Sequence, residues 1–253
     1  MRKINLIKYF RMINEGLTIK DKLAIIRYFI TGNKKLVRQV TIKNKDGIFY
    51  CGNNMGNVWV ASSFHEPYLQ EYFNIQNGVF VDIGANIGKY TIKIANQLSR
   101  ERDKVVSIEA EEENSQKIEE SIKLNNLKNV ILENVACYSK NGKIKLYLDE
   151  IPGHHTIIKS DYRKSKRSIT VKAKKLDTIL KENKINKVDF IKIDVEGAEV
   201  EVLKGAKKTL SQIPRPRIIF EAWDEKYLNK TKKILKVYEY EIRKITDTHY
   251  FAC

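Results

Sequence analysis

The stretch Val81-Asp-Ile-Gly-Ala-Asn-Ile-Gly88 closes a short apolar segment and is followed by a helical pattern. Gly84 permits a tight turn with the backbone close to a ligand, and Gly88 lets the helix begin against the strand with free N–H groups. A nicotinamide-binding turn would have glycine at the position of Asp82. A carboxylate there would repel a pyrophosphate and suits a ligand with a cationic group. The stretch therefore predicts a strand, a tight turn and a helix around such a ligand.

The end of the next predicted strand supplies a second acidic residue. Glu109 stands about 20 residues after Gly88, where an acid accepts hydrogen bonds from both hydroxyls of a ribose. Glu109 would therefore bind a ribose, and Asp82 would face a cationic group. A ligand with both features is S-adenosylmethionine, which carries a ribose, a sulfonium and an amino group. Two alternatives stay open at this point, a nucleotide-binding turn and a purely structural turn.

Strands and helices alternate along the chain from Gly78 onward. The predicted strands cover residues 79–83, 104–109, 130–135, 190–194 and 217–221, with helices at 88–99, 112–125, 176–183 and 198–210. Each strand is short, apolar on both faces and ends in a polar or acidic residue, which is typical of a parallel sheet covered on both sides. A helix at 225–236 and an antiparallel pair at 237–245 and 248–251 close the pattern. The fold class is therefore α/β, a doubly wound, Rossmann-like and mostly parallel sheet with a closing hairpin.

Further elements are predicted inside and before this pattern. A hairpin at Asn141-Gly142 should lead into a strand at 143–148, with another strand at 168–171. Residues 3–30 show the apolar spacing of two short amphipathic helices around Gly16. After these helices, strands are predicted at residues 36–42 and 47–51, joined by a hairpin at Asp46-Gly47, and a third strand at residues 58–60. We therefore divide the chain into an extension, residues 1–76, and an α/β domain, residues 77–253.

The composition limits the classes of protein that remain. Among 253 residues no apolar run approaches the ~20 residues that span a bilayer, and the first residues lack the pattern of a secretory signal. We therefore expect a soluble, cytoplasmic protein. Three distant cysteines, Cys51, Cys137 and Cys253, argue against a disulfide framework or a zinc site.

The charge is strongly basic and unevenly distributed. Lys and Arg number 47 against 31 Asp and Glu, a net charge of +16, and residues 159–175 hold eight basic side chains and one acid. Such a surface attracts anionic partners, although a bias that keeps the protein soluble explains it equally well. The basic, amphipathic helices before residue 30 would also suit the surface of an anionic membrane.

A second motif, Lys192-Ile-Asp-Val-Glu-Gly-Ala-Glu199, follows the fourth predicted strand of the α/β pattern. Asp194 ends that strand beside the expected ligand crevice, and Glu196 lies just beyond it. Two acids at the mouth of a site orient a substrate hydroxyl or assist its deprotonation. For Glu199 we prefer a structural role, as a first-turn acid that interacts favourably with the helix dipole.

With these motifs the sequence resembles the FkbM family of S-adenosylmethionine-dependent methyltransferases over roughly residues 66–222. The resemblance rests on the segments VDIGANIGKYT (81–91), IEA (108–110), NVACYSKNGKIKLY (134–147), KIDVEGAEVEVLKGA (192–206) and IIFEAW (218–223). It implies the seven-stranded methyltransferase fold and O-methylation, often of a sugar or polyketide hydroxyl.

The resemblance also implies roles for individual residues. Four residues of the turn would hold the methionine end of the cofactor: Asp82, Gly84, Asn86 and Gly88. Glu109 would hold the ribose, and Asn134 with Ala136 would border the adenine. Glu66 matches an acid that often precedes the first motif and would close over the cofactor. Ala110 follows the ribose acid, where family members frequently have proline.

Attack by an alkyl hydroxyl requires a base. The candidates are Asp194, Glu221 at the end of the fifth strand, and His154 or His155 in a glycine-containing loop. Asp194, Glu221 and a histidine could instead bind a divalent ion, although no spacing requires a metal, and we assign none. The acceptor is expected to be a small molecule or a glycan, most simply a carbohydrate or glycoconjugate.

Two rival functions remain. The basic charge favours an RNA methyltransferase acting on ribose, although no appended RNA-binding module is visible. The other rival is a catalytically silent scaffold that retains the fold alone. The oligomeric state is not predicted by any feature of the sequence.

Overall fold

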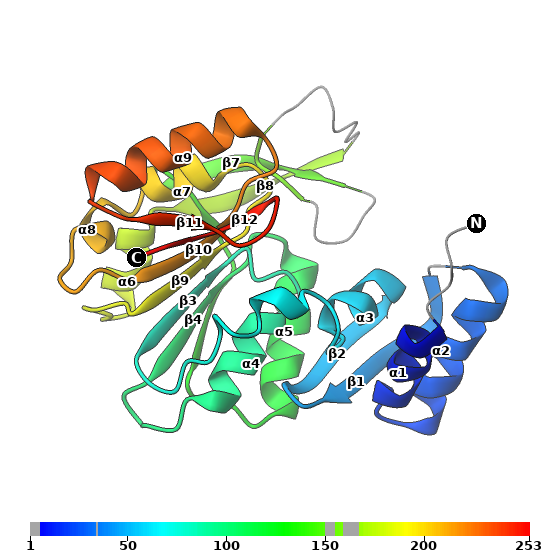
Figure 1. The fold of residues 1–253 in the computed structure, drawn as a ribbon. Coiled ribbons are helices and arrows are strands. Elements are labelled where there is room, and N and C mark those ends of the chain that lie inside the picture. The colour runs from blue at the N-terminus through cyan, green and yellow to red at the C-terminus, as the bar shows by residue number, and fades with distance from the viewer. Residues whose placement is uncertain (1–5, 34, 150–154, 159–166) are drawn as a thin grey trace.

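The computed structural model describes residues 6–33, 35–149, 155–158 and 167–253 (Figure 1). Within these ranges a seven-stranded sheet has the order β11-β12-β10-β9-β3-β4-β5. Its strands are β3 (Val79–Ile83), β4 (Lys104–Ile108), β5 (Val130–Glu133), β9 (Phe190–Ile193), β10 (Arg217–Glu221), β11 (Ile242–Lys244) and β12 (His249–Ala252). The pairs among β5, β4, β3, β9 and β10 are parallel, whereas β12 is antiparallel to both β10 and β11. The predicted fold class is confirmed.

The order of the strands reverses beside β3. From β3 the chain continues outward to β4 and β5, whereas β9 and β10 lie on the other side of β3. In open α/β sheets the crevice for a ligand lies at such a reversal, beyond the carboxyl ends of the strands. The topology thus places the loops after Ile83 and Ile193 next to each other.

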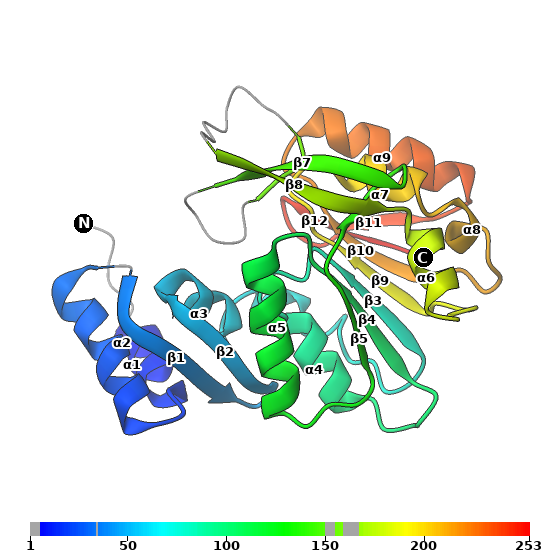
Figure 2. The ribbon, with the colours of Figure 1, turned by 180° about the vertical axis from the view of Figure 1, so that it is seen from behind.

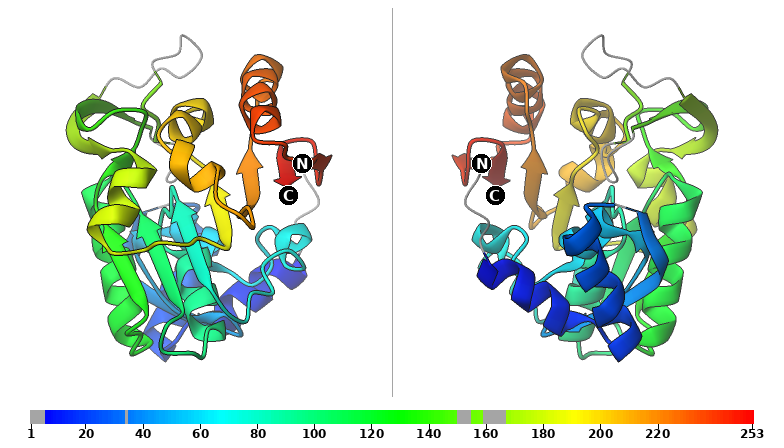
Figure 3. Two further views of the ribbon diagram at one scale, coloured as in Figure 1. Left: turned by 90° about the vertical axis from the view of Figure 1, so that its left-hand side faces the viewer. Right: turned by 90° about the vertical axis from the view of Figure 1, so that its right-hand side faces the viewer.

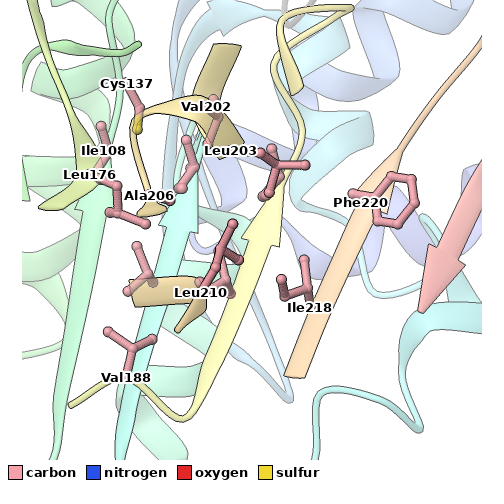
Figure 4. Packing of buried hydrophobic residues seen from close by; sticks show 14 of the residues in the cluster. Ile108, Cys137, Leu176, Val188, Val202, Leu203, Ala206, Leu210, Ile218 and Phe220 are labelled. Atoms are coloured by element: carbon pink, nitrogen blue, oxygen red, sulfur yellow. The ribbon is translucent and has the colours of Figure 1, made fainter. Parts of the chain in front are cut away.

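Helices cover both faces of the sheet. One face carries α4 (Lys89–Gln97) and α5 (Glu112–Leu124), and the other carries α6 (Leu176–Glu182), α7 (Glu199–Lys204), α8 (Lys207–Leu210) and α9 (Glu225–Val237). Alternate strand residues point to the two faces: Phe80 and Phe190 pack with α4, whereas Val81 and Ile191 pack with the second group of helices. Figure 4 shows part of the cluster beneath this second group of helices, in which Leu176 lies near Ile108, and Leu203 and Leu210 lie nearer Ile218.

The helix predicted at residues 198–210 is two short helices, α7 and α8. They separate at Gly205, where a Cβ atom would lie 2.2 Å from the carbonyl oxygen of Tyr138. The carbonyl of Gly205 also accepts a hydrogen bond from the N–H of Asp177 at the start of α6. A close tertiary contact therefore interrupts a pattern that looks continuous in the sequence.

The N-terminal part contains α1 (Leu6–Glu15), α2 (Ile19–Thr31), β1 (Lys35–Asn44), β2 (Gly47–Asn54) and α3 (Met55–Ala61). The two predicted helices and the β1–β2 hairpin are confirmed. The strand predicted at residues 58–60 is wrong, because these residues belong to α3. Asn54 caps this helix by accepting a hydrogen bond from the N–H of Gly56, and Met55, Val58 and Ala61 are buried along one side.

This N-terminal part packs on α4 and α5, as Figure 2 shows for β2. Its hydrophobic cluster includes Ile87 and Ile92. The N–H groups of Ile48 and Tyr50 donate to the side chains of Asn125 and Ser121 at 2.9 Å. The C-terminal end of α5 thus provides hydrogen-bond acceptors for the outer edge of β2. The division of the chain between residues 76 and 77 stays a prediction.

A second, three-stranded sheet has the order β6-β8-β7 and contains β6 (Ala136–Cys137), β7 (Gly142–Leu148) and β8 (Arg167–Lys174). The hairpin predicted at Asn141-Gly142 is wrong, because β7 pairs with β8 rather than with the preceding strand. Residues 159–166 of the basic stretch lie outside the described residues, and residues 167–174 form β8.

At the C-terminus, α9 continues to Val237, so β11 is shorter than the predicted strand at 237–245. In the part of the chain that the structure describes, no helix has the length and apolar character needed to cross a membrane.

Candidate active site

Two pockets meet at the carboxyl ends of β3 and β9. The first, of about 570 Å³, has walls of aliphatic side chains that include Ile83, Ile108 and Leu146, and we call it the apolar pocket. The second, of about 860 Å³, we call the charged pocket. Its principal lining residues are His65, Glu66, Tyr68, Lys89, Tyr90, Lys192, Glu221, Trp223 and His249. Both pockets are lined by Gly84, Asn86, Asp194 and Glu196, so they share one edge.

The turn after β3 provides part of this shared edge. Gly84 has φ +75°, and a Cβ atom there would lie 1.8 Å from the carbonyl oxygen of Asp194, so only glycine fits. The N–H groups of Gly84 and Ala85 both donate to the carbonyl of Ile108. Asn86 also has a positive φ, 56°, and its N–H donates to Oε2 of Glu109 at 2.8 Å. The turn thus ties the ends of β3, β4 and β9 together.

Glu109 lines the apolar pocket and is almost completely buried. Its two carboxylate oxygens accept hydrogen bonds from the N–H groups of Asn86 and Glu111 at 2.8 and 2.9 Å. Burial raises the pKa of Glu109 to about 7, although these hydrogen bonds oppose the change. Glu109 therefore changes its protonation state near neutral pH in the absence of a ligand.

The residues predicted to border an adenine separate into two kinds. Ala136 and Ala110 line the apolar pocket. Asn134 does not line it; its Nδ2 donates to the carbonyl oxygens of Glu109 and Ala110 at 2.9 and 3.3 Å. Asn134 therefore positions the loop that follows β4.

Asp82 is fully buried behind the turn and lines neither pocket. Its Oδ2 accepts a hydrogen bond from the hydroxyl of Thr91 at 2.7 Å, and its Oδ1 lies 3.9 Å from Nζ of Lys192. Burial raises the pKa of Asp82. In this position the carboxylate interacts with a protein cation, and its predicted contact with the methionine end stays a prediction.

Gly88 begins α4 with φ +83° and lines neither pocket. A Cβ atom there would lie 3.1 Å from Ile118. Gly88 therefore permits α4 to pack against α5, rather than against the strand as the sequence suggested.

Three carboxylates meet in the charged pocket. Asp194, Glu196 and Glu221 each place an oxygen within 4.8 Å of the others. Burial and the neighbouring charge of Asp194 raise the pKa of Glu221, so this is the carboxyl that retains a proton. Carboxylate oxygens in this arrangement are ligands that a divalent cation accepts. Of the two histidines considered as partners, His155 does not belong to the group, and His154 lies outside the described residues.

Lys192 balances part of this negative charge. Its Nζ lies 3.0 Å from Oδ2 of Asp194 and 3.9 Å from Oδ1 of Asp82. Burial favours the neutral amine, but the carboxylates of Asp194, Asp82 and Glu66 raise the pKa of Lys192 above its ordinary value. A buried ammonium group thus links Asp82 in β3 to Asp194, the residue that follows β9.

Glu66 lies in the charged pocket with a left-handed backbone, φ 50°. Its Oε2 accepts a hydrogen bond from the hydroxyl of Tyr90 at 2.7 Å, and its Oε1 lies 3.5 Å from Nε2 of His249. Burial opposes ionisation, but His249, His65 and nearby lysines hold the pKa of Glu66 well below its ordinary value. Glu66 is therefore ionised in this pocket.

His249 lines the charged pocket and was missed by the sequence reasoning. It is buried, and its Nε2 lies between the carboxylates of Glu66 and Glu221, at 3.5 and 3.6 Å. The residue on β10 that faces it in the antiparallel register is Glu221. Pairing the predicted strands at 217–221 and 248–251 would have brought these two residues together.

Lys192 was also missed, although it stands in the quoted motif. It faces Asp82 in the parallel register of β3 and β9. A single lysine in an otherwise apolar strand was the available signal, because a buried lysine requires carboxylate partners.

The comparison with known families now bears on this site. Residues 82–243 match the family described as "Methyltransferase FkbM domain". The chain belongs to this family. It is therefore a methyltransferase enzyme with S-adenosylmethionine as its cofactor, which confirms the resemblance.

Individual relatives agree with this assignment. Methyltransferase sdnD of Sordaria araneosa is 25% identical over 206 residues, which make up 70% of this chain and 78% of the relative. The crystal structure of methyltransferase FkbM from Methylobacillus flagellatus KT has a TM-score of 0.50 and 15% identity. That match covers 98% of this chain and 59% of the solved one, so the present chain spans little more than half of its length and the likeness concerns the fold alone.

The residues of this FkbM domain fit the cofactor. Gly84 and Asn86 line both pockets, and Oδ1 of Asn86 is a buried acceptor without a hydrogen-bond partner among the described residues. Glu109 stands at the end of β4, where the ribose hydroxyls would donate to it. The individual contacts of these residues with the cofactor stay predictions.

Two further predicted residues of the FkbM domain have clear positions. Oε1 of Glu199 accepts from the N–H groups of Gly197 and Val195, which supports the structural role. His155 lines the apolar pocket but not the charged pocket, and its Nδ1 accepts from the N–H of Asp149 at 3.0 Å. Burial lowers the pKa of His155. Of the pocket in which the three carboxylates meet, His155 is therefore not a lining residue.

Proposed function

We propose that this FkbM methyltransferase methylates a hydroxyl group of a carbohydrate or glycoconjugate, which binds in the charged pocket. The observation that carries the proposal is the shared edge of the two pockets, formed by Gly84, Asn86, Asp194 and Glu196. The apolar pocket suits the adenosine portion of the cofactor. An acceptor in the charged pocket would then reach the same edge from the opposite side.

The acids at this edge suit a hydroxyl as the nucleophile. S-adenosylmethionine supplies an electrophilic methyl group on its sulfonium. Asp194 accepts the proton of the acceptor hydroxyl as the oxygen forms its bond to carbon. Glu221, which retains a proton, and Lys192, which donates to Asp194 at 3.0 Å, hold that carboxylate in place. His249, 3.6 Å from Glu221, is the next group available for the proton.

The rim of the charged pocket favours a sugar. Trp223 and Tyr68 line it and remain 62% and 41% exposed. Exposed aromatic rings at a pocket offer a flat apolar face with a polar edge. The carboxylates and Asn86 provide acceptors for several hydroxyl donors. A ring with one apolar face and many hydroxyls matches both features.

RNA fits this pocket less well. Residues 167–170 of β8 are exposed and extend the basic stretch, which is the feature that favours a nucleic acid. However, the carboxylates of Glu66, Asp194 and Glu196 outnumber the two lysines, Lys89 and Lys192, that line the pocket where the acceptor would bind. Phosphates are repelled by such a pocket. RNA therefore remains an outcome of the test rather than the proposal.

The test is transfer of a labelled methyl group from S-adenosylmethionine into cell extract that is separated into glycan and glycolipid, RNA and protein fractions. We expect label in the glycan or glycolipid fraction. Asp194→Asn should lower the rate by about 10²–10⁴-fold, because it removes the base. Binding of the cofactor, measured by calorimetry, should change far less. The control Glu241→Gln alters an exposed carboxylate away from both pockets.

Label that ribonuclease removes would contradict the proposal and favour RNA. A normal rate in Asp194→Asn would show that another group takes the proton.

A further inference from the structure

The helices α1 and α2 expose an unusual amount of apolar surface. Their large exposed hydrophobic side chains, together with one in the connecting turn, are Ile7, Phe10, Leu17, Ile19, Leu23 and Ile30. The exposed fraction ranges from 41% for Leu17 to 80% for Ile30. Single exposed apolar residues are common, but a group on one pair of helices marks an interaction surface.

The exposed residues of α2 lie on one side of the helix. Ile19, Leu23, Arg27 and Ile30 follow one another at intervals of four, four and three residues, the spacing of a single helical face. The opposite face contains Ala24 and Ile25, which are buried in the hydrophobic cluster of the N-terminal part. The helix is therefore apolar on both sides, and only one of these sides is covered.

The charges on these two helices have one sign at the surface. Their exposed charged side chains are Lys8, Arg11, Lys20 and Arg27. The acids are engaged elsewhere: Oε1 of Glu15 accepts from the hydroxyl of Ser63, and buried Asp21 accepts from Thr18 in the cap of α2. Between residues 6 and 33 no acidic side chain is classed as exposed.

This surface adjoins the charged pocket. Nζ of Lys8 lies 5.7 Å from the centre of the Trp59 ring, which is itself partly exposed on α3. The next residue, Val60, lines the charged pocket. Figure 1 shows α1 and α2 next to α3 and at the opposite end of the molecule from α8, and Figure 3 shows them in the lower part of the molecule, with α9 at the top.

We propose that α1 and α2 form a docking surface for an anionic lipid bilayer. Apolar side chains such as Ile19 and Leu23 enter the interfacial region, and the basic side chains interact with negatively charged headgroups. The charges decide against a second copy of the chain, because two such surfaces would repel each other. Combined with the proposed function, docking would bring the charged pocket close to a glycan attached to a membrane lipid. The docking itself does not depend on that function.

The test is sedimentation of the protein with vesicles of phosphatidylglycerol and phosphatidylcholine, compared with vesicles of phosphatidylcholine alone. We expect binding only to the anionic vesicles, weakened by added salt. Lys20→Glu/Arg27→Glu should reduce the partition coefficient by about tenfold or more, since each basic residue near such a surface contributes appreciably. The matched control Lys207→Glu/Lys208→Glu makes the same change in charge on exposed residues of α8 and should retain binding.

A second pair separates the apolar contribution from the charge. Ile19→Ser/Leu23→Ser should also weaken binding, whereas Ile213→Ser/Val237→Ser, at two other exposed apolar positions, should not. Circular dichroism verifies that each variant is folded. The proposal is overturned if the wild type does not sediment with anionic vesicles at low salt, or if the control pairs lose binding equally. A dimer of this surface would also overturn it. In that case analytical ultracentrifugation would show a dimer that Ile19→Ser/Leu23→Ser dissociates, and the wild type would not bind lipid. Methylation of a water-soluble acceptor should be unaffected by these variants, so the result is independent of the proposed chemistry.

Discussion

The apolar pocket and the charged pocket share an edge but are assembled from different parts of the chain. The apolar pocket is built from the ends of consecutive strands, so Gly84, Asn86 and Glu109 stand in short motifs with known spacing. The charged pocket combines Glu66, from the segment before β3, with His249, from the last strand. A site made of local motifs can be recognised in a sequence, whereas a site made by strand register requires the sheet to be assembled first.

The largest expected effect follows from removing the cation that joins the two regions. Lys192→Met leaves the carboxylates of Asp82 and Asp194 buried or half-buried without their ammonium partner. Breaking a buried ion pair from one side costs about 3–5 kcal/mol. We expect the free energy of unfolding in urea to fall by this amount, together with activity.

The matched control for this variant is Lys187→Met. Lys187 forms an ion pair with Asp189 at 2.9 Å but is more than half exposed. Exposed pairs contribute about 0–1 kcal/mol. Equal losses in both variants would mean that the buried position of Lys192 is unimportant.

The pH dependence of stability should have opposite signs in the two pockets. Burial raises the pKa of Glu109 from 4.5 to about 7, so its contribution to stability is complete below pH 4.5 and is lost as the pH rises to 7. The pKa of Glu66 is lowered, so its contribution is complete above pH 4.5 and is lost in more acidic solution. Glu109→Gln should therefore remove part of the decline between pH 4.5 and 7, and Glu66→Gln part of the decline below pH 4.5.

Denaturant unfolding of the ligand-free protein across this range measures both effects. If Glu109→Gln leaves the slope between pH 4.5 and 7 unchanged, the carboxyl ionises normally and the burial argument fails. Glu241→Gln, at an exposed position, serves as the control for both variants.

The smallest expected effect concerns Asn134, which supports the apolar pocket without lining it. Asn134→Ala removes hydrogen bonds to the carbonyl oxygens of Glu109 and Ala110. Because one of these hydrogen bonds is part-buried and the other exposed, the loss should be about 1 kcal/mol, seen as a fewfold weaker affinity for S-adenosylmethionine by calorimetry. A loss as large as that of Glu109→Ala would instead assign Asn134 a direct contact with the cofactor. Asn141→Ala, which removes hydrogen bonds to Thr178 and Lys175 but alters neither pocket lining, provides the comparison.

Most of the fold was predictable, and the errors have identifiable causes. The parallel strands were found because each is a short apolar run bounded by polar residues, and Gly84 marked the central turn. The strand predicted at 58–60 failed because alternation over three residues cannot be distinguished from a helical face when Asn54 provides a cap. The hairpin at Asn141-Gly142 failed because the partner of β7 is β8, a strand distant in sequence.

The residues of the candidate site were also predicted only in part. Asp194 and Glu221 were predicted from the ends of strands, and the structure brings their carboxylates together. His155 was named as a base because it stands in a glycine-containing loop, yet it lines the apolar pocket, and the buried histidine beside Glu221 is His249.

The linear pattern of this protein was sufficient for the α/β class, the family and the glycine turn after β3, since each depends on residues within a few positions of one another. The register of β3 with β9 placed Lys192 opposite Asp82, and the register of β10 with β12 placed His249 opposite Glu221. Such pairs arise because hydrogen bonding between strands fixes which side chains are neighbours. The spacing of residues along a chain carries no information about that choice until the sheet has formed.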